Sequence, residues 1–493
     1  MSTARKQPRQ NEGSDASRSA SKRKASGSRC PQGKGARRKR SKPLSVAHPD
    51  AAGIDVGARV HYVAVPEGRA EPAVRSFGAY TAQLEALVQW LQSCGITTVA
   101  LESTGVYWVA LYQKLEEAGL EVLLVDARQV KHVPGRKSDV QDCQWLQQLH
   151  TYGLLRAAFR PADAICRLRT LQRHRKGLVE CAAMWIQHMQ KALNEMNLHL
   201  HHVLTDLTGQ SGLAILDAML AGERDPQKLA ALADWRVKQS AAQIEAALTG
   251  DYRAELLFVV GQALENYRQL QQQIARCDLA IEQQLASMGD CARPEPAAGP
   301  SGPVPPEAAA AQPNKRRKPP TAREVSLAGQ LKRLLGVDLT AIPGLNVLAV
   351  LSLISEIGTD MSKWRHEKAF ASWLGLSPTN KVSGERVLSA RTRRVNNRAA
   401  TILRLAAMML GKTDTPLGAF YRRKRAQLGA PKAITATARK LACLIYRLIK
   451  AGQSYQQGDA RPYELKYKDQ MVRSLRKRAA GLGFELVELP QAA

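Results

Sequence analysis

Apolar and polar positions follow two different periods between residues 51 and 158. Four stretches rich in apolar and β-branched residues predict strands: 53–57, 60–65, 97–102 and 121–125. Three stretches with apolar residues three and four positions apart predict helices: 81–94, 106–118 and 139–150. Strands that alternate with helices indicate an α/β domain over 51–158.

The pattern becomes helical beyond residue 159. Residues 159–292 are rich in Leu, Ala and Gln and resemble an antiparallel helical hairpin or an interrupted coiled coil, which would act as a spacer or a dimerisation element. Residues 326–455 predict a compact, all-α C-terminal domain, and 456–493 form a weakly patterned basic tail.

Two segments have almost no apolar pattern. Residues 1–50 contain 14 Lys and Arg against 3 Asp and Glu, so we expect a disordered basic arm. This arm either increases nonspecific nucleic-acid affinity or only solubilises the chain. Residues 293–325 are expected to be a linker, because nine of the 24 prolines lie in 293–320.

The charge of the chain points to a polyanionic partner. Lys and Arg number 72 against 43 Asp and Glu, a formal net charge of +29, and nucleic acid is the partner that such an excess suits. The eight cysteines form no CxxC pair, which argues against a zinc ribbon and for a reduced, cytosolic protein. No apolar run is long enough to predict a membrane span.

Four acidic residues of the α/β domain are candidates for chemistry. Asp55 lies in an apolar strand, where a carboxylate is costly unless a cation or donor meets it. Glu102 ends another strand, where ligands collect in open sheets. Asp139 and Asp142 follow the predicted N-cap Ser138, so both project from the first turn of one helix.

Taken together, these four carboxylates suggest a two-metal phosphoryl-transfer site. Hard oxygen ligands suit Mg²⁺ or Mn²⁺, and two such ions can stabilise the attacking and leaving oxygens of a displacement. The simpler interpretation of each residue is a turn aspartate or an acid that favours a helix N-terminus.

Ser383 is a second candidate, in a Ser-Gly turn surrounded by basic residues that could stabilise a phosphate transition state. The basic residues expected to contact nucleic acid are Lys137, Lys381, Arg386, Arg393, Arg394 and Arg398. Gly344, in a predicted turn between helices, either lets backbone N–H groups approach phosphate or is an ordinary packing glycine. His199, His201 and His202 were weighed as metal ligands, but a solvated helix face is the expected interpretation.

The order of the motifs resembles the DEDD insertion-sequence transposases of the IS110 family. The resemblance covers about 48–450 and is carried by Gly53-Ile54-Asp55-Val56-Gly57, Leu101 to Trp108, Pro134 to Asp142, Gly153-Leu154-Leu155, Ile342 to Leu345, Gly375 to Pro378 and Ser383-Gly384.

This resemblance implies a ribonuclease H or RuvC-like domain, a coiled-coil insertion and a C-terminal transposase domain with a serine nucleophile. It implies that Asp55, Glu102, Asp139 and Asp142 are the DEDD acids and that Ser383 attacks DNA to give a phosphoserine in a composite site. It also implies guidance by a structured bridge RNA, action as a homodimer or homotetramer, and a nucleoid-associated location in the cytoplasm.

Two other functions remain open. The first is a metal-dependent junction nuclease in which water, not Ser383, is the nucleophile. The second is a protein that binds RNA and DNA without catalysis, although four grouped acids would repel phosphates unless they hold a cation.

Overall fold

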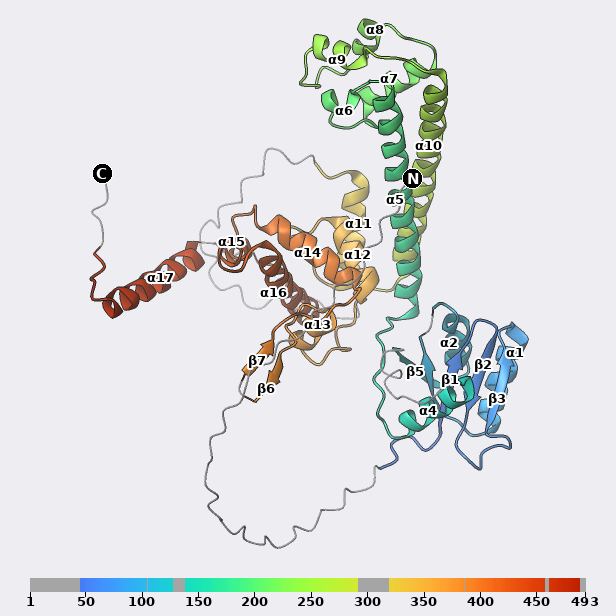
Figure 1. Ribbon diagram of the computed structural model, residues 1–493. Helices are drawn as coiled ribbons and strands as arrows, with labels where there is room; N and C mark the ends of the chain where they lie inside the picture. Colours follow the sequence, from blue (N-terminus) through green and yellow to red (C-terminus); the bar gives the residue numbers. More distant parts are fainter. Residues whose placement is uncertain are drawn as a thin grey trace, which may run out of the picture. The chain divides into compact units, whose positions relative to one another are not determined.

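The computed structural model describes residues 45–103, 105–126, 138–290, 319–384, 386–456 and 461–487. Most of the predicted basic arm, the linker as far as residue 318, and Lys137 lie outside these residues. The chain divides into two compact units, residues 1–158 and 159–493, and each is described by itself (Figure 1).

The first unit is built on a five-stranded sheet of order β3-β2-β1-β4-β5. Its strands are β1 Ala51–Val56, β2 Val60–Ala64, β3 Val74–Gly78, β4 Thr98–Glu102 and β5 Glu121–Val125. The pairs β1–β2 and β2–β3 are antiparallel, whereas β1–β4 and β4–β5 are parallel. This mixed α/β sheet is consistent with the predicted RuvC-like class, and β3 is a strand that the pattern did not predict.

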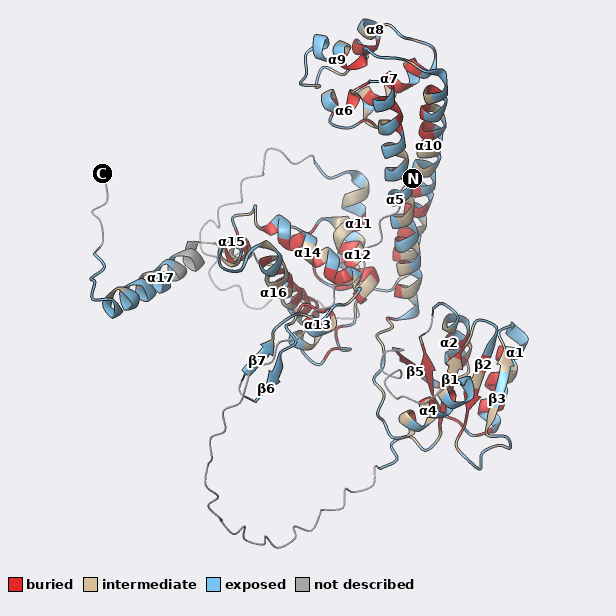
Figure 2. Ribbon diagram, in the orientation of Figure 1, coloured by how far each residue is buried: buried red, intermediate tan, exposed pale blue. Residues whose placement is uncertain are grey.

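Three helices cover the sheet, namely α1 Thr81–Ser93, α2 Trp108–Glu117 and α4 Asp139–Thr151. Leu87 of α1 and Leu111 of α2 share one core with Ile54 of β1, while Leu146 of α4 packs with Ala100 of β4 in another. Figure 2 shows that β1 is largely buried, whereas β3 at the edge of the sheet is more exposed. Because strand side chains alternate between faces, residues 51, 53 and 55 of β1 point toward α4.

Gly53 allows α4 to cross β1 closely. A Cβ atom at position 53 would lie 2.2 Å from the backbone N of Gln147 and 2.5 Å from the carbonyl O of Cys143. Helix backbone cannot yield as a flexible side chain does, so a larger residue must push α4 away from the sheet.

We therefore expect Gly53→Ala to lower the free energy of unfolding of the first unit by about 1–3 kcal/mol, measured by urea denaturation. Gly78→Ala is the matched control in the same sheet, because its Cβ would meet only the Gln83 side chain at 3.4 Å. Equal stability of the two variants would contradict the packing argument.

The second unit begins with two long helices, α5 Asp163–Glu195 and α10 Ala254–Ser287, which lie side by side (Figure 1). They are antiparallel: Leu168, near the start of α5, shares a core with Ile281 near the end of α10, whereas Met189 shares another with Val260. Four short helices connect them: α6 Leu200–Val203, α7 Gln210–Leu220, α8 Pro226–Ala230 and α9 Ala241–Leu248. The predicted helical hairpin is thus present, without evidence of a coiled coil.

The C-terminal region is helical, as predicted, with a small addition. Its helices are α11 Ala322–Leu335, α12 Val347–Ile357, α13 Glu367–Trp373, α14 Arg398–Leu410, α15 Pro416–Leu428, α16 Ala430–Ala451 and α17 Arg461–Gly481. A hairpin of β6 Lys381–Ser383 and β7 Arg386–Ser389 interrupts them, so the region is not purely α-helical. Helix α17 lies in the segment expected to be a weakly patterned tail, and α11 starts inside the segment expected to be linker.

The antiparallel helices and the C-terminal helices share one hydrophobic core within the second unit. Ile165, Leu168 and Ile281 pack with Leu331, Ile354 and other residues of α11, α12, α14 and α16. Phe159, Trp364, Phe370 and Trp373 contact one another at this junction in tilted and edge-to-face arrangements, which places the three C-terminal aromatics in the core.

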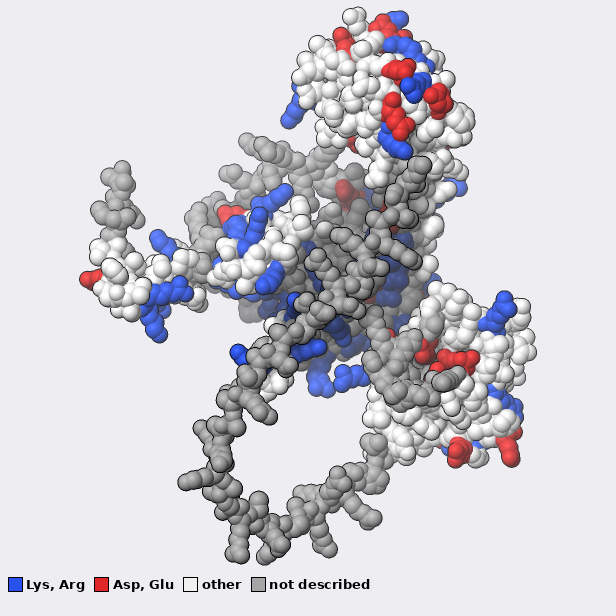
Figure 3. Space-filling view, viewed as in Figure 1, with Lys and Arg blue, Asp and Glu red and all other residues white. Residues whose placement is uncertain are grey.

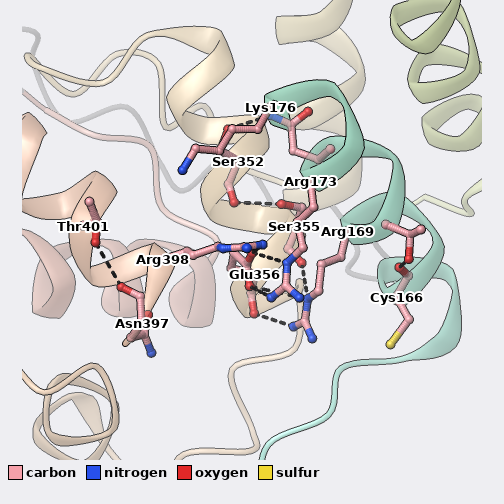
Figure 4. A network of polar contacts seen from close by, with 12 residues as sticks. Cys166, Arg169, Arg173, Lys176, Ser352, Ser355, Glu356, Asn397, Arg398 and Thr401 are labelled. Atoms are coloured by element: carbon pink, nitrogen blue, oxygen red, sulfur yellow. Dashed lines mark hydrogen bonds and ion pairs between the residues drawn. The ribbon is translucent and has the colours of Figure 1, made fainter. Parts of the chain in front are cut away.

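A polar network around Glu356 fastens α5 to the C-terminal helices (Figure 4). Arg173 donates two hydrogen bonds to the Glu356 carboxylate, at 2.9 and 2.8 Å. Arg169 donates to the backbone carbonyls of Ser355 and Glu356, and Arg398 of α14 approaches the same carboxylate at 3.9 Å. One carboxylate that is only 12% exposed therefore compensates three guanidinium groups.

Glu356→Gln leaves these arginines without their shared negative charge. We expect the free energy of unfolding of the second unit to fall by about 1–3 kcal/mol, measured by urea denaturation. Glu265→Gln on the exposed side of α10 is the control and should leave stability unchanged within about 0.5 kcal/mol.

Within the described ranges, no helix is long and apolar enough to cross a membrane. The six cysteines that the structure describes are all free thiols.

Candidate functional site

Asp55 and Glu102 lie on neighbouring parallel strands at the same edge of the sheet. The register pairs Ile54 of β1 with Leu101 of β4, so the two acids occupy the next position along each strand. Both follow a residue that packs against α1 and α2, and alternation therefore turns both toward the face covered by α4. Glu102 is 8% exposed, and Asp55 is half-buried.

The start of α4 supplies the other two acids. Ser138 is the N-cap, and its hydroxyl accepts a hydrogen bond from the backbone N–H of Gln141, as predicted. Asp139 and Asp142 lie in the first turn of the helix. Cys143 follows them, is fully buried, and faces β1 above Gly53. The close crossing of α4 over β1 thus carries both aspartates toward Asp55.

The electrostatics of Asp55 show that the four acids interact. The pKa of Asp55 is raised from 3.8 to about 6, mostly by burial and then by the charges of Glu102, Asp139 and Asp142, in that order. A backbone N–H, that of Val56, acts in the opposite direction. Burial also raises the pKa of the Cys143 thiol to about 12, with Asp55 and Asp142 contributing, so this thiol stays protonated.

This arrangement fits a hard divalent cation. Asp55 and Glu102 end neighbouring strands, and Asp139 and Asp142 begin the helix that covers them, so a bound cation would reduce the repulsion between these carboxylates. Carboxylate oxygens are the ligands that Mg²⁺ and Mn²⁺ accept in proteins. Asp55, Glu102, Asp139 and Asp142 are therefore the residues that could hold such ions.

Ser383 lies at the exposed end of the β6–β7 hairpin in the second unit. The register places it opposite Arg386, and Gly384 after it has φ of +59°, which the turn requires. The apolar side chains of Val382 and Leu388 are 57% and 66% exposed. A hairpin that exposes apolar residues beside a basic one is typical of a binding surface.

The predicted nucleic-acid contacts have different surroundings. Lys381 pairs with Ser389 across the hairpin. Arg393 donates to the backbone carbonyl of Ser372 at 3.4 Å, and Arg398 belongs to the Glu356 network. Arg394 is exposed in the segment between the hairpin and α14.

Gly344 has φ of +90°, and a Cβ atom there would lie 2.8 Å from the carbonyl O of Ala406 in α14. This close approach gives the glycine a packing role, the simpler of the two interpretations considered.

One cluster was not expected from the sequence. Potential ligand atoms of His199, His201 and His202 lie within 4.8 Å of one another, the tightest such grouping of three that the described part of the chain offers. The signal was the spacing His-x-His-His: residues 199 and 202 lie three apart and so share a helix face, and His201 lies beside His202 in the short helix α6.

Two family models match the chain. Residues 52–198 match a model for transposases of the DEDD type named after IS110, and residues 338–422 match a model described as the transposase IS116/IS110/IS902 family. The first match contains all four acids, and the second contains Ser383 and the hairpin. No curated protein matches the chain.

Proposed function

We propose that this chain, which belongs to the IS110 family of transposases, uses its four carboxylates and Ser383 to cut and rejoin DNA strands. Transposases of this family act on DNA, so the chain is an enzyme of DNA strand cleavage and transfer. The observation that carries the proposal is the placement of the four acids: Asp55 and Glu102 end neighbouring parallel strands, and Asp139 and Asp142 begin α4, which crosses β1 closely at Gly53.

The role of the acids is to hold divalent metal ions, and we assign Mg²⁺, or Mn²⁺ in its place, to Asp55, Glu102, Asp139 and Asp142. When bound, the cation supplies charge stabilisation to the attacking and leaving oxygens of the phosphodiester. Asp55 and Glu102 are fixed by β1 and β4, while Asp139 and Asp142 are fixed by the N-cap of α4. Such rigid placement keeps the reorganisation needed for catalysis small.

The role of Ser383 is nucleophilic attack. Its Oγ loses a proton and forms a bond to the DNA phosphorus, while the bond from phosphorus to one sugar oxygen breaks and that oxygen is protonated. The product is a phosphoserine ester, and attack by a sugar hydroxyl reverses the same exchange to rejoin a strand. Arg386, directly opposite Ser383, is placed to stabilise the phosphate charge.

Basic surfaces of the second unit support binding to more than one nucleic acid. Lys and Arg dominate the exposed helix α17, as Figure 3 shows, and Lys440 of α16 has its pKa lowered by burial and by Arg423, Lys424 and Arg447. Electrostatic repulsion among these Lys and Arg side chains is reduced when a polyanion binds to them. We therefore propose a structured guide RNA as a second partner, with a homodimer or homotetramer as the active form.

The test is strand exchange on element-end DNA with the RNA transcribed from the flanking sequence, in the presence and absence of Mg²⁺. Exchange that requires both the metal ion and the RNA supports the proposal. Cleavage without covalent attachment of the protein to DNA would favour the water-dependent nuclease instead. Binding of both nucleic acids without any cleavage would favour a protein that has no catalytic role.

A further inference from the structure

His199 is the N-cap of the short helix α6, which contains His201 and His202, and all three histidines closely follow the end of α5. Asn197, two residues beyond the helix, has φ of +55°, a left-handed conformation that asparagine tolerates better than most residues. The backbone N–H of His199 donates to the carbonyl of Ala247 at the end of α9, at 2.8 Å. The turn is therefore fixed at both sides, by α5 and by α9.

The rings of these histidines lie against one another. His199 and His202 are stacked with centroids 5.1 Å apart, and His201 and His202 are 4.2 Å apart. Leu200, between them in sequence, is fully buried in the core that α5, α7, α9 and α10 share. Because Leu200 anchors the backbone inward, the histidines on both sides of it are held at the surface of this core.

The hydrogen bonding of His199 leaves one ring nitrogen available as a ligand. Its Nε2 lies 3.0 Å from Oδ1 of Asn197, which accepts only if Nε2 carries the proton. The opposite nitrogen, Nδ1, is then a lone-pair donor, and it is buried without a hydrogen-bond partner among the described residues. A buried polar atom without a partner costs free energy, which a bound cation would recover.

We propose that His199, His201 and His202 bind a borderline divalent cation of the Zn²⁺ class. Nitrogen ligands from three histidines suit this class, whereas Mg²⁺ prefers oxygen. Asn197 holds the protonated nitrogen of His199 as the carboxylates and carbonyls around known zinc sites do. A fourth position stays open to water.

The adjustment that binding requires is small. Ligand nitrogens around tetrahedral zinc, at bonds of about 2.0–2.1 Å, are roughly 3.4 Å apart. The three atoms are already within 4.8 Å, so ring rotations of the more exposed His201 and His202 suffice. His199, which Asn197 and Ala247 fix, is the ligand that needs to move least.

The consequence for the protein is structural. The cation ties the end of α5 to α6 and, through the bond between His199 and Ala247, to α9. The bound cation thereby stabilises the packing of the short helices that join the two long antiparallel helices. This site is separate from the carboxylates and from Ser383, so it does not depend on the proposed catalytic function.

The test uses the full chain, equilibrated with Zn²⁺ in the presence of excess Mg²⁺, which competes for oxygen ligands but not for imidazole nitrogens. Zinc that remains after gel filtration is measured by mass spectrometry. We expect the triple variant His199→Asn/His201→Asn/His202→Asn to retain one equivalent less than the wild type. The double variant His174→Asn/His188→Asn, with both exposed histidines on α5, is the control and should retain as much as the wild type.

A second variant tests the geometry without removing a ligand. Asn197→Gly keeps the left-handed turn, because glycine adopts it freely, but removes the oxygen that orients His199. We expect its Zn²⁺ affinity to fall by about 10–100-fold, measured by competition with a chromophoric chelator. Equal zinc content in the triple variant and the wild type, or unchanged affinity in Asn197→Gly, would overturn the proposal.

Discussion

Ser383→Ala is expected to abolish covalent attachment of the protein to DNA and to reduce strand transfer by roughly 10³-fold or more. The substitution removes only the hydroxyl oxygen of a side chain at the exposed end of the β6–β7 hairpin. No buried contact is lost, so folding and DNA binding should stay unchanged. The measurement is denaturing electrophoresis of labelled DNA after incubation with protein, guide RNA and Mg²⁺.

Ser389→Ala is the matched control. Ser389 ends the opposite strand of the same hairpin, and its hydroxyl accepts a hydrogen bond from the backbone N–H of Arg391 at 3.4 Å. Ser389→Ala therefore removes the same chemical group as Ser383→Ala does, at a position where the hydroxyl has a local structural role. We expect covalent attachment to persist. If Ser383→Ala also kept the attachment, the nucleophile would have to be another residue.

The position of Arg386 makes the Ser383 result more informative. Arg386→Gln keeps a hydrogen-bonding side chain opposite Ser383 but removes the positive charge. If the arginine stabilises the phosphate charge, its loss slows formation of the covalent product without preventing it. The two substitutions therefore separate the nucleophile from the residue that assists it.

The elements that are regular in sequence were predictable. The strands that bear Asp55 and Glu102 and the helix that begins at Asp139 appear within one or two residues of the predicted positions, because apolar runs and an N-cap serine mark them locally. The expectation that the four acids lie close together rests on the rule that neighbouring parallel strands end at the same edge of a sheet. Gly53, which decides how closely α4 approaches, gave no signal of that role in the sequence.

The features missed are those that depend on contacts between distant segments. β3 has a weakly apolar pattern and becomes a strand by pairing with β2. The shared core of α5, α10 and the C-terminal helices joins residues more than a hundred positions apart, which a change of pattern near residue 292 cannot show. The β6–β7 hairpin did have a local signal, a Ser-Gly turn between valines, but it was interpreted only as a turn.

Asp55→Asn is expected to change stability and activity in opposite directions. In the wild type the pKa of Asp55 is about 6, above the 3.8 of an unperturbed aspartate. The protonated form is thus favoured by folding, and stability from this group is lost as the pH rises from about 4 through 6. At pH 7.5 without divalent ions, Asp55→Asn should therefore stabilise the first unit, on the order of 1 kcal/mol because the half-exposed site is partly screened.

The same substitution should lower strand transfer by roughly 10²–10³-fold or more, because a ligand of the proposed cations is lost. Wild-type melting temperature should rise with added Mn²⁺ at pH 7.5 and rise less at pH 5, where protons compete for Asp55, whereas the variant should respond weakly at both. Glu121→Gln, at the start of strand β5 and so at the opposite end of the parallel strands from Asp55 and Glu102, is the control and should behave as the wild type. A variant that is destabilised without metal ions would show that Asp55 is a structural residue, since a carboxylate whose charge is disfavoured by burial and by neighbouring acids gains stability from losing that charge.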